Sequence, residues 1–188
     1  QPFLEEGCTA NGVDTDLCRI GPEALADYDV VVLCLDNYAA KALFNELWMQ
    51  LPPERRPVVI MDGAHNPGAA RELRESLERC FPGKKLHYIM GMFKDKDFRT
   101  VIRLTAPLAE DIITVETPNN PRALPALELK KAVEAVNPRT QAAGSIEQAV
   151  KLSLERADKQ DVIVIFGSLS FLGEAEKAVL TGGDGNEP

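Results

Sequence analysis

The segment DGAHNP at residues 62–67 carries the side chains best suited to chemistry. Asp62 ends an apolar run, and His65 is one of only two histidines in the 188-residue chain. Asn66 is a favoured N-cap and Pro67 a favoured first helical residue, so a helix should begin beside both side chains. Its N-terminal N–H groups and dipole would attract an anion. Asp62 could then bind a ribose hydroxyl, and His65 a phosphate or a carboxylate. The plainer alternative is that Asp62 and Asn66 only cap the helix and that His65 packs on the turn.

A second polar segment, GMFKDKD, occupies residues 91–97. It follows another apolar run, and Asp95 or Asp97 can begin the next helix. Lys94 and Lys96 add local positive charge that suits a phosphate. A solvated, charged turn is the alternative for this segment.

Two further segments have a similar character. In TPNNPRALP (117–125), two prolines fix an extended path and place Arg122 near the start of a helix, where a guanidinium can bind a carboxylate or a phosphate. In FGSLSFLGE (166–174), Ser168 could donate a hydrogen bond to an anion, and Ser170 could act as a cap. The alternative for residues 117–125 is a rigid loop. The alternative for residues 166–174 is an ordinary strand-to-helix turn.

Strands must position these segments. Five apolar runs are continuous rather than alternating and rich in Val and Ile, which is typical of strands buried on both faces of a parallel sheet. These runs are 29–36, 57–62, 85–93, 111–116 and 161–167, with a shorter sixth candidate at 139–144.

Helical periodicity fills the gaps between the strands. The predicted helices are 38–51, 67–81, 97–109, 125–136, 145–158 and 172–180. In the second of them Ala69, Ala70, Leu73 and Leu77 form one apolar stripe. Alternating strands and helices predict an α/β fold, a Rossmann-like open and mostly parallel sheet with helices on both faces. Ligands bind beyond the carboxyl ends of strands in such sheets, which is where all four polar segments fall.

Composition narrows the possible partners. The net charge of −8 argues against nucleic acid and against an acidic membrane surface. No apolar run reaches the ~18 residues that a membrane span needs, and no signal peptide is recognised. Cys34 and Cys80 fall in apolar patterns and should be buried thiols. The sequence does not decide whether Cys8 and Cys18 form a disulfide. We therefore expect a reduced, cytoplasmic setting.

Several catalytic patterns are missing from the sequence. We find no Ser-His-Asp set and no metal-binding histidine pair, and His87 fits a core or edge position of a strand. There is also no G-x-x-x-x-G-K-[ST], so a protein of this kind that used ATP would carry its main phosphate loop elsewhere. The chain begins at Gln1 rather than Met, which favours a fragment.

The four segments, taken in order, resemble a known family. D-G-A-H-N-P, G-x-x-x-D-K-D, N-N-P-R-A-L-P and G-S-L-x-x-L-G-E together look like the C-terminal domain of folylpolyglutamate synthase/dihydrofolate synthase, within the Mur ligase superfamily. The resemblance covers residues 57–180. Residues 1–56 are of uncertain affiliation, and residues 181–188 are expected to form a flexible tail.

The resemblance implies a function. Enzymes of this family use ATP and magnesium to convert a folate or dihydropteroate carboxylate into an acyl phosphate, with release of ADP. The amino group of L-glutamate then attacks the acyl phosphate, and phosphate leaves. Their N-terminal ATPase domain holds the phosphate loop and the metal, so this chain alone should be inactive. The C-terminal domain closes over the nucleotide and desolvates the acyl phosphate.

The resemblance also implies residue roles. Asp62 and His65 would be the catalytic pair, and Asp62, Asn66 and Lys94 would bind nucleotide. His65, Ser168 and Arg122 would bind glutamate. Asp95, Lys96 and Asp97 match family positions to which we assign no role. No metal ligand is expected in this chain.

Two features depart from the family. The ATPase domain is missing, and the family's upstream P-G-R segment has no counterpart, because Arg55 and Arg56 lie too close to Asp62. Residues 28–48 instead faintly resemble ThiF/MoeB adenylating proteins. The alternatives to a ligase domain are therefore a non-catalytic nucleotide- or anion-binding module and a fragment of an adenylating protein.

Overall fold

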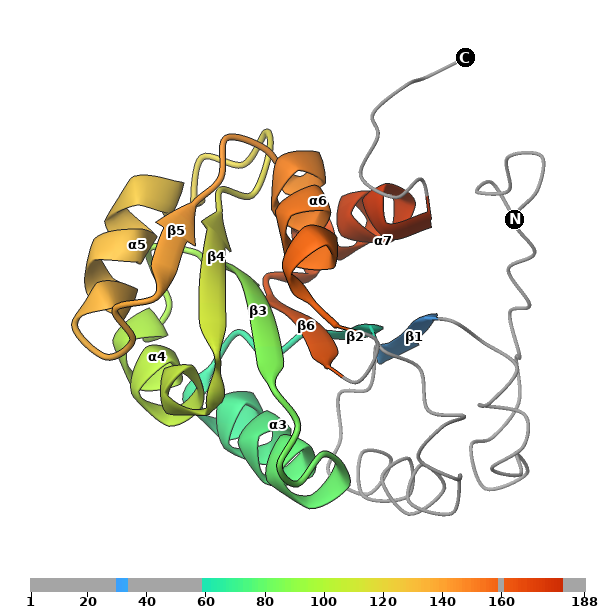
Figure 1. The fold of residues 1–188 in the computed structure, drawn as a ribbon. Helices are drawn as coiled ribbons and strands as arrows, with labels where there is room; N and C mark the ends of the chain where they lie inside the picture. The colour runs from blue at the N-terminus through green and yellow to red at the C-terminus, as the bar shows by residue number, and fades with distance from the viewer. Residues whose placement is uncertain (1–29, 34–58, 159–160, 181–188) are drawn as a thin grey trace, which may run out of the picture.

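The structure is a computed structural model that describes residues 30–33, 59–158 and 161–180. In these residues, six parallel strands form one sheet in the order β1-β2-β6-β3-β4-β5 (Figure 1). The strands are β1 (Val30–Leu33), β2 (Val59–Asp62), β3 (Leu86–Gly91), β4 (Asp111–Val115), β5 (Thr140–Ala142) and β6 (Val162–Gly167). The predicted α/β class and parallel sheet are confirmed.

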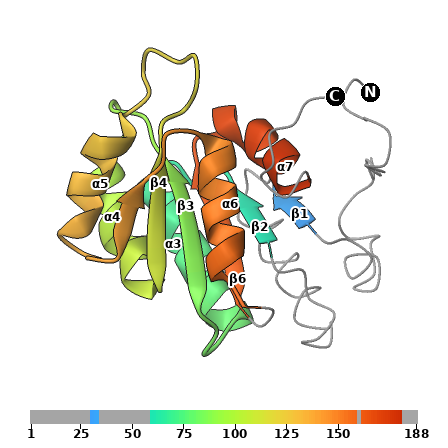
Figure 2. The same cartoon turned by 45° about the horizontal axis from the view of Figure 1, so that its top comes forward.

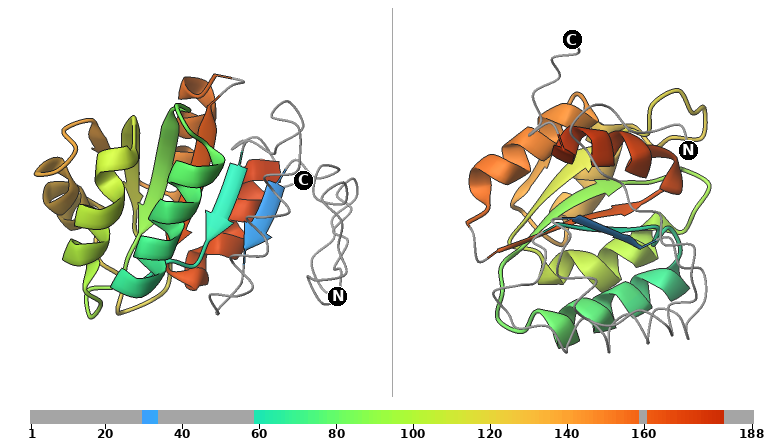
Figure 3. Two further views of the ribbon diagram at one scale, coloured as in Figure 1. Left: turned by 90° about the horizontal axis from the view of Figure 1, so that it is seen from below. Right: turned by 90° about the vertical axis from the view of Figure 1, so that its right-hand side faces the viewer.

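Helices cover both faces of the sheet (Figure 3). On one face lie α3 (Pro67–Cys80), α4 (Phe98–Thr105) and α5 (Ala126–Glu134), and on the other lie α6 (Ile146–Arg156) and α7 (Leu172–Leu180). Two short 3₁₀ turns, η3 (Ala106–Leu108) and η4 (Leu169–Phe171), complete the described elements. None of the described helices combines the length and apolar composition needed to cross a bilayer.

Successive side chains of a strand point to opposite faces of the sheet, so each strand contributes to two hydrophobic cores, one on each face. Tyr88 and Met90 of β3 pack under α3, α4 and α5, whereas Ile89 between them packs under α6 and α7. In the same way, Val164 of β6 joins the first core and Ile165 the second. Every position of β2, β3 and β6 is buried, which explains why these runs are apolar without alternation.

The helix starts follow from the local sequence. Asn66 caps α3, with its Oδ1 accepting a 3.0 Å hydrogen bond from the N–H of Ala69. Asp97 caps α4 through the N–H of Thr100, and Ser145 caps α6 through the N–H of Gln148. The predicted helix 97–109 was too long: α4 ends at Thr105 and continues as η3, which contains Pro107. Proline lacks the N–H that an α-helix needs at that position.

The last strand in the chain lies in the middle of the sheet. β6 is inserted between β2 and β3, with α3 leaving β2 on one face and α7 following β6 on the other (Figure 3). The loops after β2, β6, β3 and β4 are therefore neighbours in space, in an order that differs from their order in the chain. A crevice opens at such a switch point of an α/β sheet.

Of the elements predicted within residues 1–56, only the strand at 29–36 is represented in the described residues, as β1. This strand pairs in parallel with β2, as an edge strand of the same sheet. The predicted helix 38–51, the tail 181–188 and Cys8, Cys18 and Cys34 lie outside the described residues. Cys80 is buried and is not part of a disulfide, as predicted.

A buried charged cluster lies at the amino end of the sheet. His87 in β3 is 3% exposed, and its Nδ1 and Nε2 lie 2.8 Å from Asp111 Oδ2 and 3.2 Å from Asp161 Oδ2. Both ring nitrogens face carboxylate oxygens, so an N–H on either nitrogen can donate to one of them. Arg156 adds a positive group, 3.6 Å from Asp111. The cluster therefore joins β6, β3 and β4, and it confirms His87 as a core residue.

Candidate functional site

The loops after β2 and β6 pack directly against each other. Asp62 ends β2 and is paired with Phe166 of β6 in the sheet register. Ser168 lies two residues after Phe166, directly after the end of β6. A Cβ on Gly63 would lie 2.5 Å from Cδ2 of Leu169, so the glycine allows the two loops to approach closely. Asp62 and Ser168 are 3% and 2% exposed. The structure thus places both predicted residues at one end of two adjacent strands.

His65 lies in the same loop as Asp62, one residue before the cap of α3. Its Nδ1 lies 2.9 Å from the carbonyl oxygen of Gly63. Because a carbonyl only accepts, Nδ1 donates, and Nε2 of a neutral ring is then the acceptor. The side chain is only partly buried, so a basic nitrogen is available at the start of α3.

The N-terminus of α3 offers less to an anion than the sequence predicted. Asn66 accepts the N–H of Ala69 with its side chain and that of Ala70 with its carbonyl. Pro67 has no N–H. Gly68 therefore supplies the one remaining N–H of the first turn, together with the helix dipole.

The loop after β6 is also tied to β3. Gly167 has φ +127, and the N–H of Ser168 donates to the carbonyl of Gly91 over 2.9 Å. Ser168 Oγ accepts the N–H of Ser170, so Ser168 rather than Ser170 caps η4. The hydroxyl proton of Ser168 can still be donated, which suits contact with an anionic oxygen.

The loops after β3 and β4 form a second cluster. Arg122 binds Asp95 with two hydrogen bonds, from Nε to Oδ1 at 3.2 Å and from Nη2 to Oδ2 at 2.6 Å. The guanidinium also lies over the ring of Phe93, 4.8 Å from its centroid. The hydrogen bond from Arg122 lowers the pKa of Asp95, and the same pairing raises that of Arg122. Figure 2 shows the two loops together at one end of the sheet.

The predicted residues therefore form two groups. Asp62, His65, Asn66 and Ser168 gather after β2 and β6, whereas Lys94 and Arg122 belong to the loops after β3 and β4. Strands in a sheet are about 4.8 Å apart, so β2 and β4 are separated by roughly 14 Å. A ligand that contacts residues of both groups must extend across this span.

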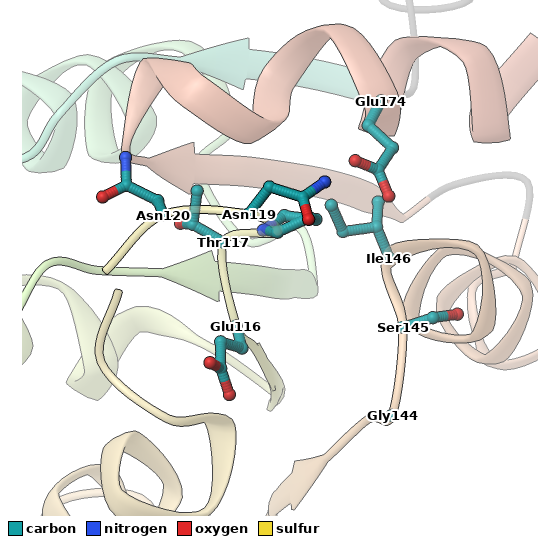
Figure 4. Close-up of a pocket in the computed structure, with 9 residues that line it drawn as sticks. Glu116, Thr117, Asn119, Asn120, Gly144, Ser145, Ile146 and Glu174 are labelled. Atoms are coloured by element: carbon teal, nitrogen blue, oxygen red, sulfur yellow. The ribbon is translucent and has the colours of Figure 1, made fainter. Parts of the chain in front are cut away.

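A cavity that the sequence does not predict lies at this edge of the sheet. It has a volume of about 480 Å³ and lies between the loop after β4, the start of α6 and α7 (Figure 4). Its lining residues are Glu116, Thr117, Pro118, Asn119, Asn120, Gly144, Ser145, Ile146 and Glu174. Burial and the charge of Glu147 raise the pKa of Glu174. No predicted site residue lines this cavity, although Thr117–Asn120 and Glu174 belong to two of the polar segments that the sequence singles out. Asn119 has φ 51.

The described residues contain no cluster suited to a metal. No three His, Cys, Asp or Glu side chains within them converge to hold an ion. A nucleotide fits better, because a carboxylate, a helix start and several hydrogen-bond donors meet at the ends of β2 and β6.

Comparison with known proteins agrees with this arrangement. Residues 49–169 match the family described as Mur ligase, glutamate ligase domain. The dihydrofolate synthase/folylpolyglutamate synthase of Haemophilus influenzae is 33% identical over 132 residues, which make up 68% of this chain and 30% of that protein.

Two solved structures share the fold. The folylpolyglutamate synthase of Thermotoga maritima has a TM-score of 0.56 and 26% identity, covering 66% of this chain and 28% of that one. The Mycobacterium tuberculosis folylpolyglutamate synthase complexed with ADP and AMPPCP has a TM-score of 0.58 and 25% identity, covering 82% and 36%. The chain thus spans about a third of the length of these relatives. Since the family match covers more than half of the chain, the chain belongs to the Mur ligase family, in its glutamate ligase domain.

Proposed function

We propose that this chain is the C-terminal domain of an ATP-dependent ligase that adds L-glutamate to folate or dihydropteroate. The observation that carries the proposal is the meeting of Asp62, His65 and Ser168 at the ends of β2 and β6. They come from segments far apart in the sequence, and both segments belong to the family resemblance. The ligase reaction would take place in the cytoplasm.

Asp62, Asn66 and Lys94 form the proposed nucleotide side of the site. Asp62 would accept hydrogen bonds from ribose hydroxyls, while the dipole of α3 and the ammonium of Lys94 would attract phosphate. The relative from M. tuberculosis, which is described as complexed with ADP and AMPPCP, supports a nucleotide ligand. The family resemblance implies that an ATPase domain would hold the magnesium that accompanies ATP.

His65, Ser168 and Arg122 form the proposed glutamate side. ATP supplies the phosphoryl group that converts the folate carboxylate into an acyl phosphate. The acceptor nitrogen of His65 would hold a proton of the incoming amino group, and the Ser168 hydroxyl would donate to an anionic oxygen. Arg122 would bind a glutamate carboxylate with paired hydrogen bonds. Closure against the ATPase domain would exclude water from these groups.

The test is to combine this chain with a separately prepared ATPase domain. ATP-dependent transfer of labelled glutamate to dihydropteroate and to a reduced folate is measured, with the chain alone expected to be inactive. His65→Ala should lower the rate by at least about 100-fold, because His65 would contact the reacting amino group. Asp62→Ala should lower the rate at limiting ATP, because the contact with the ribose hydroxyls would be lost.

Two control variants separate function from folding. Asp158→Ala removes an exposed carboxylate at the opposite end of the sheet, and Ser170→Ala removes an exposed hydroxyl beside Ser168. Both should retain the full rate, with circular dichroism confirming that every variant folds. Unchanged transfer by both Asp62→Ala and His65→Ala would contradict the proposal and favour a non-catalytic binding module.

A further inference from the structure

We propose that Asp95 is a positioning residue that orients Arg122 toward a substrate carboxylate. This inference rests on the proposed function, because it takes Arg122 to be a glutamate ligand. Asp95 and Arg122 are separated by 27 residues in the chain, and their side chains make a two-point contact at the end of the sheet.

The geometry of the pair leaves one edge of Arg122 available. A guanidinium has five N–H donors in a fixed plane. Asp95 takes the edge formed by Nε and Nη2. Nη1 and the second hydrogen of Nη2 remain on the neighbouring edge, which matches the two oxygens of another carboxylate. One arginine can thus bind Asp95 and a substrate carboxylate in the same plane.

Other contacts restrain this orientation. An isolated exposed ion pair contributes little, because two long side chains must be held in place. Here the ring of Phe93 covers one face of the guanidinium. The backbone is fixed as well: the N–H of Lys94 donates to the carbonyl of Arg122 over 2.9 Å, and the N–H of Arg122 donates to Asn120 Oδ1 over 3.0 Å. The pair is therefore part of a network that joins two loops.

The pairing also affects which ligand Arg122 selects. Asp95 offsets the charge of the guanidinium, so that attraction for anions in general is reduced. A ligand then gains from matching the remaining pair of N–H groups, which a planar carboxylate does well. We accordingly expect Asp95 to affect glutamate binding more than nucleotide binding.

Asp97 provides a matched control in the same loop. It is exposed like Asp95, but its carboxylate caps α4 and does not contact Arg122. Asn is also a good N-cap, so Asp97→Asn removes a charge and keeps the cap. Asp95→Asn makes the same chemical change and leaves a single acceptor oxygen for Arg122.

The first experiment follows the guanidinium of Arg122 by NMR in the chain as it stands. The Nε–H of Arg122 should exchange slowly with water in the wild-type chain and in Asp97→Asn. In Asp95→Asn its exchange should be at least about tenfold faster, because one of the two hydrogen bonds to the carboxylate is lost. Equal exchange rates in the wild type and in Asp95→Asn would overturn the inference, whatever the ligase assay shows.

The second experiment measures KM in the two-domain glutamate transfer assay. Asp95→Asn should raise KM for glutamate about tenfold and leave KM for ATP and kcat within about twofold, whereas Asp97→Asn should leave all three near wild type. Asp95→Glu, which keeps two oxygens, should recover part of the loss. A glutamate KM raised by Arg122→Ala and not by Asp95→Asn would overturn the positioning role alone. A glutamate KM unchanged in Arg122→Ala would overturn the assignment of Arg122 as a glutamate ligand.

Discussion

The carbonyl oxygen of Gly91 occupies the space that a side chain on Gly167 would need. The two residues stand opposite each other in the register of β3 and β6, and an ideal Cβ on Gly167 would lie 2.0 Å from that oxygen. Gly167 also has φ +127, which side chains rarely allow. The close approach fixes how the chain leaves β6 and so where Ser168 lies.

Gly167→Ala should therefore destabilise the domain strongly. The clash is with backbone, which cannot move aside as a flexible side chain can, so a loss of about 3 kcal/mol or more in the free energy of unfolding is expected. Urea unfolding followed by circular dichroism measures it. Gly173→Ala is the matched control, because a Cβ there meets nothing within 4 Å and Ala favours the helix. Similar stabilities of the two variants would contradict the prediction.

His87→Ala should be costly for a different reason. It leaves the carboxylates of Asp111 and Asp161 in a buried site without the imidazole between them. Breaking a buried ion pair from one side typically costs about 3–5 kcal/mol. Urea unfolding at pH 7 tests this, with His65→Ala as a control that should change stability by less than about 1 kcal/mol. A loss at His87 no larger than that at His65 would show that the cluster contributes little.

Asp161 should make the domain sensitive to acid. Burial raises the pKa of Asp161, but the hydrogen bond from the Asp158 N–H and the hydrogen bond and charge of His87 outweigh burial and hold that pKa below its usual range. Since the folded pKa is depressed, the stabilisation is present above the unfolded value of about 4 and is lost as pH falls through the folded value.

This acid sensitivity can be measured from the slope of stability against pH. In urea unfolding between pH 7 and pH 2, the free energy of unfolding should fall less steeply with decreasing pH for Asp161→Asn than for the wild type. Asp158→Asn, which changes an exposed carboxylate, should keep the wild-type slope. An unchanged slope in Asp161→Asn would place the acid-sensitive group elsewhere.

Substitutions of Asn66 can separate capping from ligand binding. Asn66→Ala removes the acceptor of the Ala69 N–H and should cost about 1 kcal/mol of unfolding free energy. Asn66→Asp keeps a capping oxygen and should keep the stability. Its added negative charge should nevertheless raise KM for ATP in the two-domain assay, because it repels phosphate. An unchanged KM for ATP in Asn66→Asp would limit Asn66 to capping.

The features that the sequence predicts correctly depend on residues close together in the chain. The caps at Asn66 and Asp97 depend on residues three positions apart, and the buried strands on composition within a few residues. The end of α4 was misplaced because the effect of Pro107 on the last turn was not taken into account.

Features that depend on contacts distant in the chain could not be predicted. The sequence indicates that the four polar segments share an edge of the sheet, but not that the fourth lies between the first and the second. The pair of Asp95 with Arg122 depends on how the loops after β3 and β4 meet, and the cavity beside Thr117 combines three separate elements. Periodicity marked His87 as a strand residue, yet its carboxylate partners come from neighbouring strands.

The central place of β6 has a consequence for the chain as it leaves the ribosome. All the other described strands are synthesised first, yet β2 and β3 cannot pair with their shared neighbour until the segment ending at Gly167 emerges. A nascent or truncated chain without β6 holds two separate pieces of sheet with unpaired edges, which invite aggregation. Asp62 and Ser168 would also stay apart in it. Emergence of β6, rather than folding of the earlier strands, therefore decides when Asp62 and Ser168 can first come together.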